Sequence, residues 1–404
     1  MSTDAYPVTR IENGNLIDTS TGLIRRQRTL HINGSRIAHT SVPIHGVALD
    51  ATDLWVMPGL IDMHVHLVGH RRPLHAADSV KSASAALTEA LAAGVTTVRD
   101  LGGPLAELQE VRRAWTCQEL LGARPLIGGE MLASAPDGHG IAAGLGKALG
   151  STADAQAAID RLARAGADHV KIALASAHGR NALPAEIASE AVRAAAAAHL
   201  PVAMHVHLQT ELLQLATQLP ITSIEHGFLL HKAPENLARM RKAGITLTPT
   251  LTVVNRLHES QDQYRQRRLA AAHGDATKTV AMAHAAGVNL AAGTDANVFG
   301  VGYGDVWQEQ ELIGQACGSR LAGLQAATCN AGRALRLPIG MLRPDYVADL
   351  LLIDVDPINE QVSPNNIVHV VQHGRLVNIP HRRETHDTTR SPVRPSRDPQ
   401  LRDS

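Results

Sequence analysis

The 404-residue sequence predicts an α/β fold: a (β/α)8 TIM barrel with a small β-sandwich domain formed from the N- and C-terminal segments. Two observations lead to this prediction. In the middle of the chain, short apolar segments alternate with Ala-rich helical segments, which is typical of βα units around a parallel sheet. On both sides of this region, short strand-like segments are separated by turn residues. A doubly wound sheet ranks second, because such sheets usually have fewer strands.

The number of βα units decides between these folds. Helical segments such as 82–94, 153–166 and 185–199 separate the candidate strands. Eight units within about 250 residues match a TIM barrel. The eight candidate strands are 59–66, 95–100, 124–131, 168–174, 201–206, 222–226, 245–251 and 288–295.

The segments outside the predicted barrel also have strand character. Short strands with turn signals fill the first part of the chain, and this pattern returns at 347–357 and 365–377. We expect the two ends to pair in one domain. The predicted boundaries are 1–58 plus 345–378 for the β-sandwich domain and 59–344 for the barrel domain. Residues 379–404 have too little apolar surface to order themselves and are predicted to be a disordered tail.

Composition narrows the function classes. Lys+Arg and Asp+Glu are balanced at 38 each, so the chain lacks the basic surface that nucleic-acid binding needs. The three cysteines have neither CxxC nor zinc-ribbon spacing, which favours reduced thiols and a cytoplasmic location. No apolar run approaches about 18 residues, so we expect no membrane partner. We expect instead a small-molecule substrate and a homo-oligomer.

Histidine and aspartate residues end several predicted barrel strands. His64 and His66 lie two apart on the first strand, so both side chains face one way and can share one ion. His205, His226 and Asp295 end the fifth, sixth and eighth strands. Each residue taken alone could equally be a surface or capping residue. Their joint occurrence at the carboxyl ends of strands, where TIM-barrel active sites gather, predicts a metal site.

Lys171 lies on the fourth predicted strand among apolar residues. An ammonium group there would be costly to bury and would repel a cation. The alternative is a lysine whose amine reaches the surface. If Lys171 lines the mouth of the barrel, it must lose its charge. Reaction with carbon dioxide would convert the amine to a carbamate, whose two oxygens could bridge two metal ions about 3.5–4 Å apart.

Several of these residues lie in motifs that resemble the amidohydrolase superfamily. The similarity covers roughly 11–378. Within the superfamily, the chain is similar to the imidazolonepropionase-like, prolidase-type branch, which includes zinc dipeptidases and ochratoxin-type amidases. The motifs are PGLIDMHVHL (58–67), LTEALAAGVTTVRDLGG (87–103), DGHG (137–140), VKI (170–172), MHVHL (204–208), SIEHG (223–227), GTDA (293–296), LQAATCNAGRALRL (324–337) and ADLLLIDVDP (348–357).

The resemblance implies a binuclear metal centre with divalent ions, which we expect to be zinc. Matching of motifs makes His64 and His66 ligands of the more buried ion together with Asp295. It makes His205 and His226 ligands of the second ion. Lys171, carbamylated by carbon dioxide, would bridge the two. Mononuclear members of the superfamily lack this lysine, so its presence argues for the binuclear form.

The ligand set implies a hydrolytic mechanism. Two divalent ions lower the pKa of a shared water, so that a bridging hydroxide forms near neutral pH, and one ion polarises the scissile carbonyl. Asp295 is the expected catalytic base and would return the proton to the leaving amine. His207 and His139 are expected pocket residues that hydrogen-bond the oxyanion or a substrate carboxylate. Solvent-facing positions are the alternative for both histidines.

The expected function is hydrolysis of a C–N bond in an N-acyl amino acid, a dipeptide or a related small molecule. A ring-opening hydrolase or deaminase is the alternative, although Glu211, six residues past His205, has an unusual spacing for a deaminase acid/base. A non-catalytic scaffold is disfavoured, because all six metal-binding positions are filled. The segments DGHG (137–140) and ALASAHG (173–179) depart from the branch pattern, which puts dipeptide specificity in doubt. Four aromatic residues beyond the sixth and eighth strands suggest an apolar pocket, with Trp307 as a core residue the alternative: Phe228, Phe299, Tyr303 and Trp307.

Overall fold

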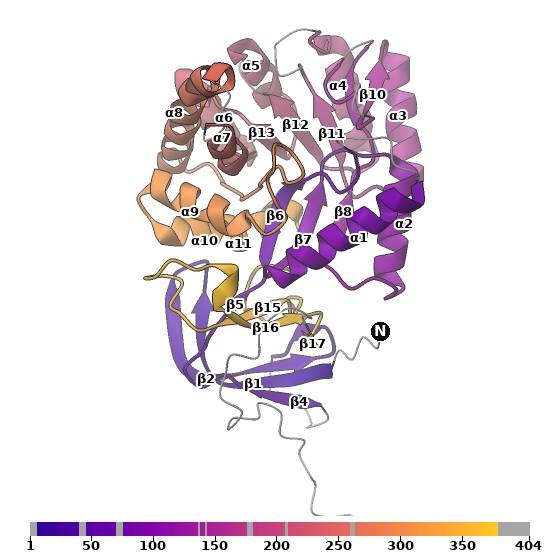
Figure 1. Cartoon of the computed structure of the whole chain (residues 1–404). Helices are drawn as coiled ribbons and strands as arrows, with labels where there is room; N and C mark the ends of the chain where they lie inside the picture. Colours follow the sequence, from indigo (N-terminus) through magenta and orange to yellow (C-terminus); the bar gives the residue numbers. More distant parts are fainter. Residues whose placement is uncertain are drawn as a thin grey trace, which may run out of the picture. The chain divides into compact units, whose positions relative to one another are not determined.

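The chain divides into two compact units (Figure 1). The terminal unit is Met1–Gly59 with Pro338–Ser404, and the central unit is Leu60–Leu337. The computed structural model describes residues 6–39, 46–69, 76–135, 138–141, 144–175, 181–206, 209–258 and 263–378. The predicted tail lies outside these residues. Among the helices described, none is both long and apolar enough to cross a membrane.

The terminal unit contains strands from both ends of the chain. They form one eight-stranded sheet in the order β17-β16-β15-β5-β1-β2-β3, and β4 pairs with β1. β5 pairs antiparallel with β15, which confirms that the two ends pair. β17, the first strand in this order, also pairs with β1, so the strands from β17 to β1 form a closed ring of pairings. The two-layer sandwich remains a prediction. The strands are β1 (Tyr6–Asp18), β2 (Leu23–Asn33), β3 (Arg36–Ile37), β4 (Val47–Asp50), β5 (Trp55–Pro58), β15 (Leu350–Ile353), β16 (Ile367–Gln372) and β17 (Arg375–Val377). A short 3-10 helix, η2 (Pro364–Asn366), precedes β16.

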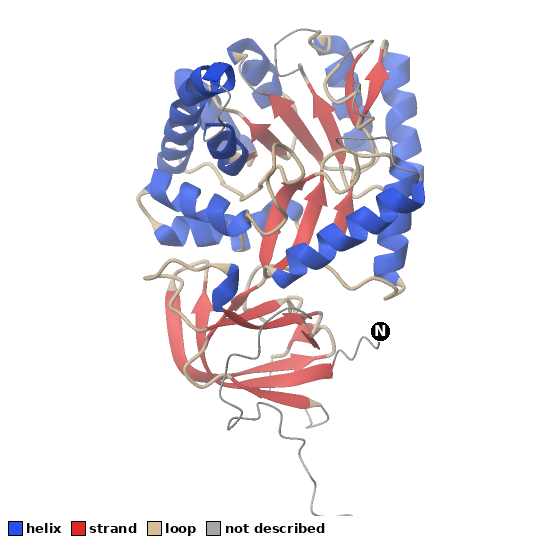
Figure 2. Ribbon diagram, in the orientation of Figure 1, coloured by secondary structure: helices blue, strands red, loops and turns tan. Residues whose placement is uncertain are grey.

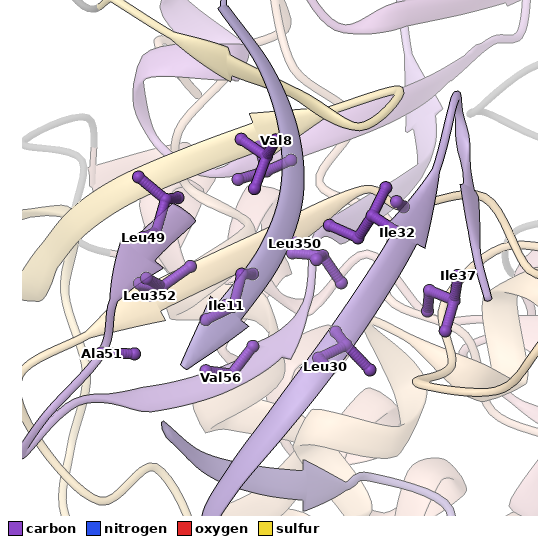
Figure 3. Packing of buried hydrophobic residues seen from close by; sticks show 12 residues of the cluster. Val8, Ile11, Leu30, Ile32, Ile37, Leu49, Ala51, Val56, Leu350 and Leu352 are labelled. Carbon is purple, nitrogen blue, oxygen red and sulfur yellow. The ribbon is translucent and has the colours of Figure 1, made fainter. Parts of the chain in front are cut away.

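An apolar cluster forms the core of the terminal unit (Figure 3). Val8 and Ile11 of β1 face Leu350 and Leu352 of β15 within this cluster, and all four are at most 2% exposed. The register of β1 against β2 shifts around Gly14. A Cβ at Gly14 would lie 2.7 Å from Cγ2 of Val56 in β5, so glycine at this position lets β1 approach β5.

The central unit contains two parallel sheets. One has the order β6-β7-β8 and the other β10-β9-β11-β12-β13-β14. The predicted third strand is divided into β8 and β9, and β10 was not predicted. The strands are β6 (Leu60–Val65), β7 (Val95–Asp100), β8 (Arg124–Ile127), β9 (Met131–Ser134), β10 (Gly146–Leu149), β11 (Val170–Ala173), β12 (Val202–Val206), β13 (Ser223–His226) and β14 (Thr246–Thr248).

Residues 288–296 link these two sheets. Residues 288–295 were predicted as the eighth strand, but among the described residues this stretch and Ala296 form only isolated parallel bridges, Leu247 with Leu290 and Val65 with Ala296. The Ala291 amide donates to the Leu247 carbonyl (3.0 Å), which ties the segment to β14. On the other side, the amide of Asp295 donates to the carbonyl of His64 (2.8 Å). The segment therefore places two predicted metal ligands next to each other.

Helices follow the strands of the central unit and lie outside them (Figure 2). In α4, for example, Ile187 and Val192 are buried together with four alanines, whose small side chains allow close packing. The N-terminus of α3 is capped by Ser151, whose side chain accepts a hydrogen bond from the Asp154 amide. The helices are α1 (Ala76–Ala92), α2 (Leu105–Thr116), α3 (Thr152–Arg164), α4 (Ala185–Ala197), α5 (Thr210–Gln218), η1 (Leu230–Lys232), α6 (Pro234–Ala243), α7 (Leu251–His258), α8 (Gln263–Ala285), α9 (Val306–Cys317), α10 (Arg320–Ala326) and α11 (Cys329–Leu335).

Candidate metal centre

The predicted ligands from β6 and from residues 288–296 meet at one point. His64 and Val65 are the last two residues of β6, and His66 follows directly. Oδ1 of Asp295 lies 3.4 Å from Nε2 of His64 and 3.3 Å from Nε2 of His66. All three residues are buried. The arrangement leaves two imidazole nitrogens and one carboxylate oxygen directed at a common position.

The histidines of β12 and β13 adjoin this group. His64, His226 and Asp295 each offer one ligand atom, and these atoms lie within 4.8 Å of one another. The ring centroids of His226 and His205 are 4.6 Å apart. His139 stacks on His205 with a centroid distance of 4.2 Å, which places this predicted pocket residue beside the cluster. His207 lies outside the described residues.

Lys171 lies on β11 and is 1% exposed, which excludes the surface alternative. Its Nζ has no hydrogen-bond partner in the structure as described. Burial lowers the pKa of Lys171 to about 8. Burial also lowers the pKa of His64 to about 4, and the nearby charge of Lys171 adds to this shift. A low pKa favours the neutral imidazole, which is the form that binds metal ions.

Three of the histidines have their Nδ1 atoms held by fixed groups. Nδ1 of His64 lies 3.0 Å from Oε2 of Glu225, and Nδ1 of His66 lies 3.0 Å from the carbonyl oxygen of Gly102. Nδ1 of His226 lies 2.8 Å from Oγ1 of Thr250. A carboxylate and a carbonyl can only accept, so His64 and His66 donate from Nδ1 and present the lone pair of Nε2.

Two of the clustered residues have left-handed backbone conformations. The φ angle is 68° at His226 and 62° at Asp295. Such values cost about 1–3 kcal/mol at non-glycine residues and gather at functional sites. Along a strand, successive side chains face opposite ways, yet Glu225 and His226 both approach His64. The left-handed turn at His226 therefore brings the end of β13 into the cluster.

A buried charged network behind the cluster escaped the sequence prediction. Glu225 is fully buried and lies 2.7 Å from Nη2 of Arg99, which is 3% exposed. Asp62 is also fully buried, and its carboxylate accepts hydrogen bonds from the amides of His64 and Thr294. Burial raises the pKa of Asp62 to about 7. Charged residues inside apolar strand segments could have indicated this network, but the sequence prediction used that pattern only for Lys171.

The four aromatic residues beyond the strands have different environments. The ring of Phe228 is buried and lies 5.7 Å from that of His226. Trp307 is buried in α9 and donates its indole N–H to the Ala93 carbonyl, so the core alternative holds for it. Phe299 is 47% exposed, and the hydroxyl of Tyr303 donates to the His66 carbonyl. Glu211 is exposed on α5 and accepts from the Thr210 hydroxyl.

The parallel strands carry a cluster of histidines and an aspartate that could hold a metal ion, as in metal-dependent enzymes, and comparison with known proteins identifies the family. Residues 55–377 match the model of the amidohydrolase family, and the chain belongs to this family. It is a hydrolase acting on C–N bonds. A search of curated proteins found no match. Family membership and the structural likenesses imply the TIM-barrel amidohydrolase fold that the sequence predicted.

Solved structures include prolidase-type relatives, as the sequence resemblance predicted. The chain is 25% identical to a putative prolidase from Bifidobacterium longum, with a TM-score of 0.81 and coverage of 91% of this chain and 94% of that chain. It is 23% identical to an Xaa-Pro dipeptidase with bound methionine, with a TM-score of 0.80 and coverage of 91% of this chain and 99% of that chain. It is 24% identical to the A. niger ochratoxinase, with a TM-score of 0.78 and coverage of 92% of this chain and 96% of that chain.

Proposed function

We propose that this protein is a binuclear metal-dependent amidohydrolase that cleaves the amide bond of an N-acyl amino acid, a dipeptide or a related small molecule. The observation that carries the proposal is the environment of Lys171. Among the described residues, its buried Nζ has no hydrogen-bond partner, and its charge acts on nearby His64. An isolated ammonium group is costly to bury. Conversion to a carbamate, followed by metal binding, would give this position both a charge and partners.

The donor set fits two divalent ions. Imidazole nitrogens and carboxylate-type oxygens are ligands that zinc takes in catalytic sites, and we expect zinc here. His64, His66 and Asp295 would hold one ion, and His205 and His226 the other, with carbamylated Lys171 shared between them. When bound, the ions would supply an activated water and polarise the scissile carbonyl.

The side chains around the ions would orient the substrate and move the proton. The Asp295 carboxylate would take a proton from the attacking water and release it to the leaving nitrogen. His139, which stacks on His205, would hydrogen-bond the substrate, and we propose the same for His207. The Phe228 ring, packed near His226, would contact an apolar part of the substrate.

The likenesses to a putative prolidase and an Xaa-Pro dipeptidase support this substrate class, since a dipeptidase cleaves the amide bond of a dipeptide. The position of Glu211 does not favour the deaminase alternative, because its side chain is exposed and accepts a hydrogen bond from the Thr210 hydroxyl. The cytoplasmic location, the homo-oligomer and the β-sandwich and barrel domain boundaries remain our predictions.

Metal analysis combined with a substrate screen tests the proposal. We expect two zinc ions per chain and hydrolysis within a panel of N-acyl amino acids, dipeptides and lactams. The Lys171→Ala variant should lose activity and metal, and short carboxylates should partly restore both. Lys278→Ala, which changes an exposed lysine of α8, is the matched control. Undiminished hydrolysis by Lys171→Ala would disprove the bridging role, and a metal-loaded protein inactive on the whole panel would disprove the function.

A further inference from the structure

A buried ion pair lies directly behind His64. Nη2 of Arg99 is 2.7 Å from Oε1 of Glu225. The other nitrogens of this guanidinium are also used: Nε donates to the Met63 carbonyl (2.7 Å) and Nη1 to Oγ of Ser223 (3.1 Å). Arg99 on β7 therefore holds the backbone of β6 and two side chains of β13 at once.

The two oxygens of Glu225 have separate partners. Oε1 accepts from Arg99 and from the Ser223 hydroxyl (2.5 Å). Oε2 accepts from Nδ1 of His64 (3.0 Å). Because Arg99 and Ser223 fix one oxygen, the other oxygen has a fixed direction. The carboxylate thus determines both the tautomer and the ring orientation of His64.

The acceptor at His64 differs from those at the other two anchored histidines. His66 donates to a neutral carbonyl, and His226 contacts a neutral hydroxyl. A carboxylate acceptor makes an imidazole a stronger metal donor than a neutral acceptor does. A buried ion pair contributes little net stability compared with apolar residues of similar size, so stability alone does not account for this pair.

We propose that Arg99 and Glu225 are positioning residues that orient and strengthen His64 as a metal ligand. The inference rests on the proposed metal-dependent function. Replacement of the Glu225 carboxylate by a neutral group should weaken binding of the ion held by His64, because a neutral acceptor makes the imidazole a weaker metal donor and fixes the ring less firmly. From other metal sites, the expected loss of affinity is about 10- to 100-fold.

The test compares metal binding in the full-length protein and three variants. Glu225→Gln removes the charge on the acceptor. The double variant Arg99→Met/Glu225→Gln also removes the opposite charge, so that no unpaired ion stays buried. Thr250→Val, an isosteric change at the neutral partner of His226, is the matched control. Circular dichroism checks the fold, and competition with a chromogenic chelator measures Co²⁺ and Zn²⁺ affinity.

We expect both Glu225 variants to bind the tighter ion about 10- to 100-fold more weakly and to shift the visible absorption bands of bound Co²⁺. Thr250→Val should weaken binding less. Wild-type affinity and an unchanged Co²⁺ spectrum in either folded Glu225 variant would overturn the inference. The readout needs no substrate. Metal binding that depends on Glu225 in a protein without amidase activity would therefore support the inference while disproving the proposed reaction.

Discussion

The apolar cluster of the terminal unit contrasts with the candidate metal centre of the central unit, where charged side chains are buried among apolar ones. The cluster in the terminal unit consists of apolar side chains such as Ile11, Val56 and Leu350, all 0% exposed. In the central unit, Lys171 and Glu225 are buried to the same degree. Apolar burial is a main source of folding stability, whereas buried charges cost free energy unless they are paired. If the buried charges serve the proposed metal centre, mutations in the apolar cluster should affect stability and mutations at the charged residues should affect activity.

The largest effect is expected at Lys171. Lys171→Met keeps the length of the side chain and removes the amine. Because the proposed shared metal ligand is lost, amide hydrolysis should fall by about 1,000-fold or more. In the metal-free state, the free energy of unfolding should not fall, since an apolar group replaces a buried amine that has no hydrogen-bond partner among the described residues. Enzyme assays and urea unfolding in the presence of a chelator measure the two effects.

Lys278→Met, at an exposed position, serves as the control and should change neither property. A strong loss of stability in metal-free Lys171→Met would mean that the lysine amine supports the fold. The proposed contrast between the two interiors would then fail at this position.

The opposite result is expected in the terminal unit. Leu350→Ala leaves a cavity in the apolar cluster and should lower the free energy of unfolding by about 2–5 kcal/mol. The number of bound metal ions per folded chain should stay unchanged. Leu23→Ala, at a position that is 53% exposed, should cost less than about 0.5 kcal/mol. Equal destabilisation by both changes would show that the cluster does not contribute the expected stability.

Glu309 adds a pH dependence to the central unit. Its carboxylate accepts from the amides of Leu251 (3.0 Å) and Thr252 (2.7 Å), but burial dominates and raises its pKa from 4.5 to about 7. The folded protein therefore holds this proton more tightly than the unfolded chain. The resulting stabilisation is complete below about pH 4.5 and is lost as the pH rises through about 7, with a magnitude on the order of 3 kcal/mol.

The measurement compares urea unfolding of wild type and Glu309→Gln between pH 5 and 8. Because both proteins share all other titratable groups, the effects of those groups cancel in the difference between the two unfolding free energies. Relative to the variant, wild type should lose stability as the pH rises. The exposed Glu235→Gln in α6 controls for loss of a carboxylate. A difference that is independent of pH would show that Glu309 stays ionised throughout this range.

The smallest effect is expected at Tyr303. Its hydroxyl donates to the His66 carbonyl at 2.7 Å, and the same carbonyl also accepts from Asn297 at 3.1 Å. Because Asn297 would still satisfy the carbonyl, Tyr303→Phe should cost only about 0.5–1.5 kcal/mol in thermal unfolding. Tyr6→Phe, at a position that is 55% exposed, should cost nothing measurable. A much larger loss would mean that Tyr303 supports the cluster in a further way.

The sequence predicted which residues end several strands but not the side-chain contacts between the strands. His64 and His226 could be found because hydrophobic strand segments end in polar residues, and parallel strands direct these ends to one side. Glu225 and Arg99 were missed because their roles arise from contacts between strands far apart in sequence. Residues 128–130 interrupt the third predicted strand, where a Cβ at Gly128 would lie 2.7 Å from Nε2 of His169. No local pattern shows that approach.

The pairing of β5 with β15 also bears on how the chain is synthesised. β5 ends at Pro58 and β15 begins at Leu350, so about 290 residues are added between them, which takes roughly 15 to 60 s on a ribosome. The last residue of the central unit, Leu337, is added before β15, which the sheet of the terminal unit requires. Until then, β5 carries an unpaired edge. A nascent chain that stalls in this interval would be prone to pair through that edge with another copy of itself.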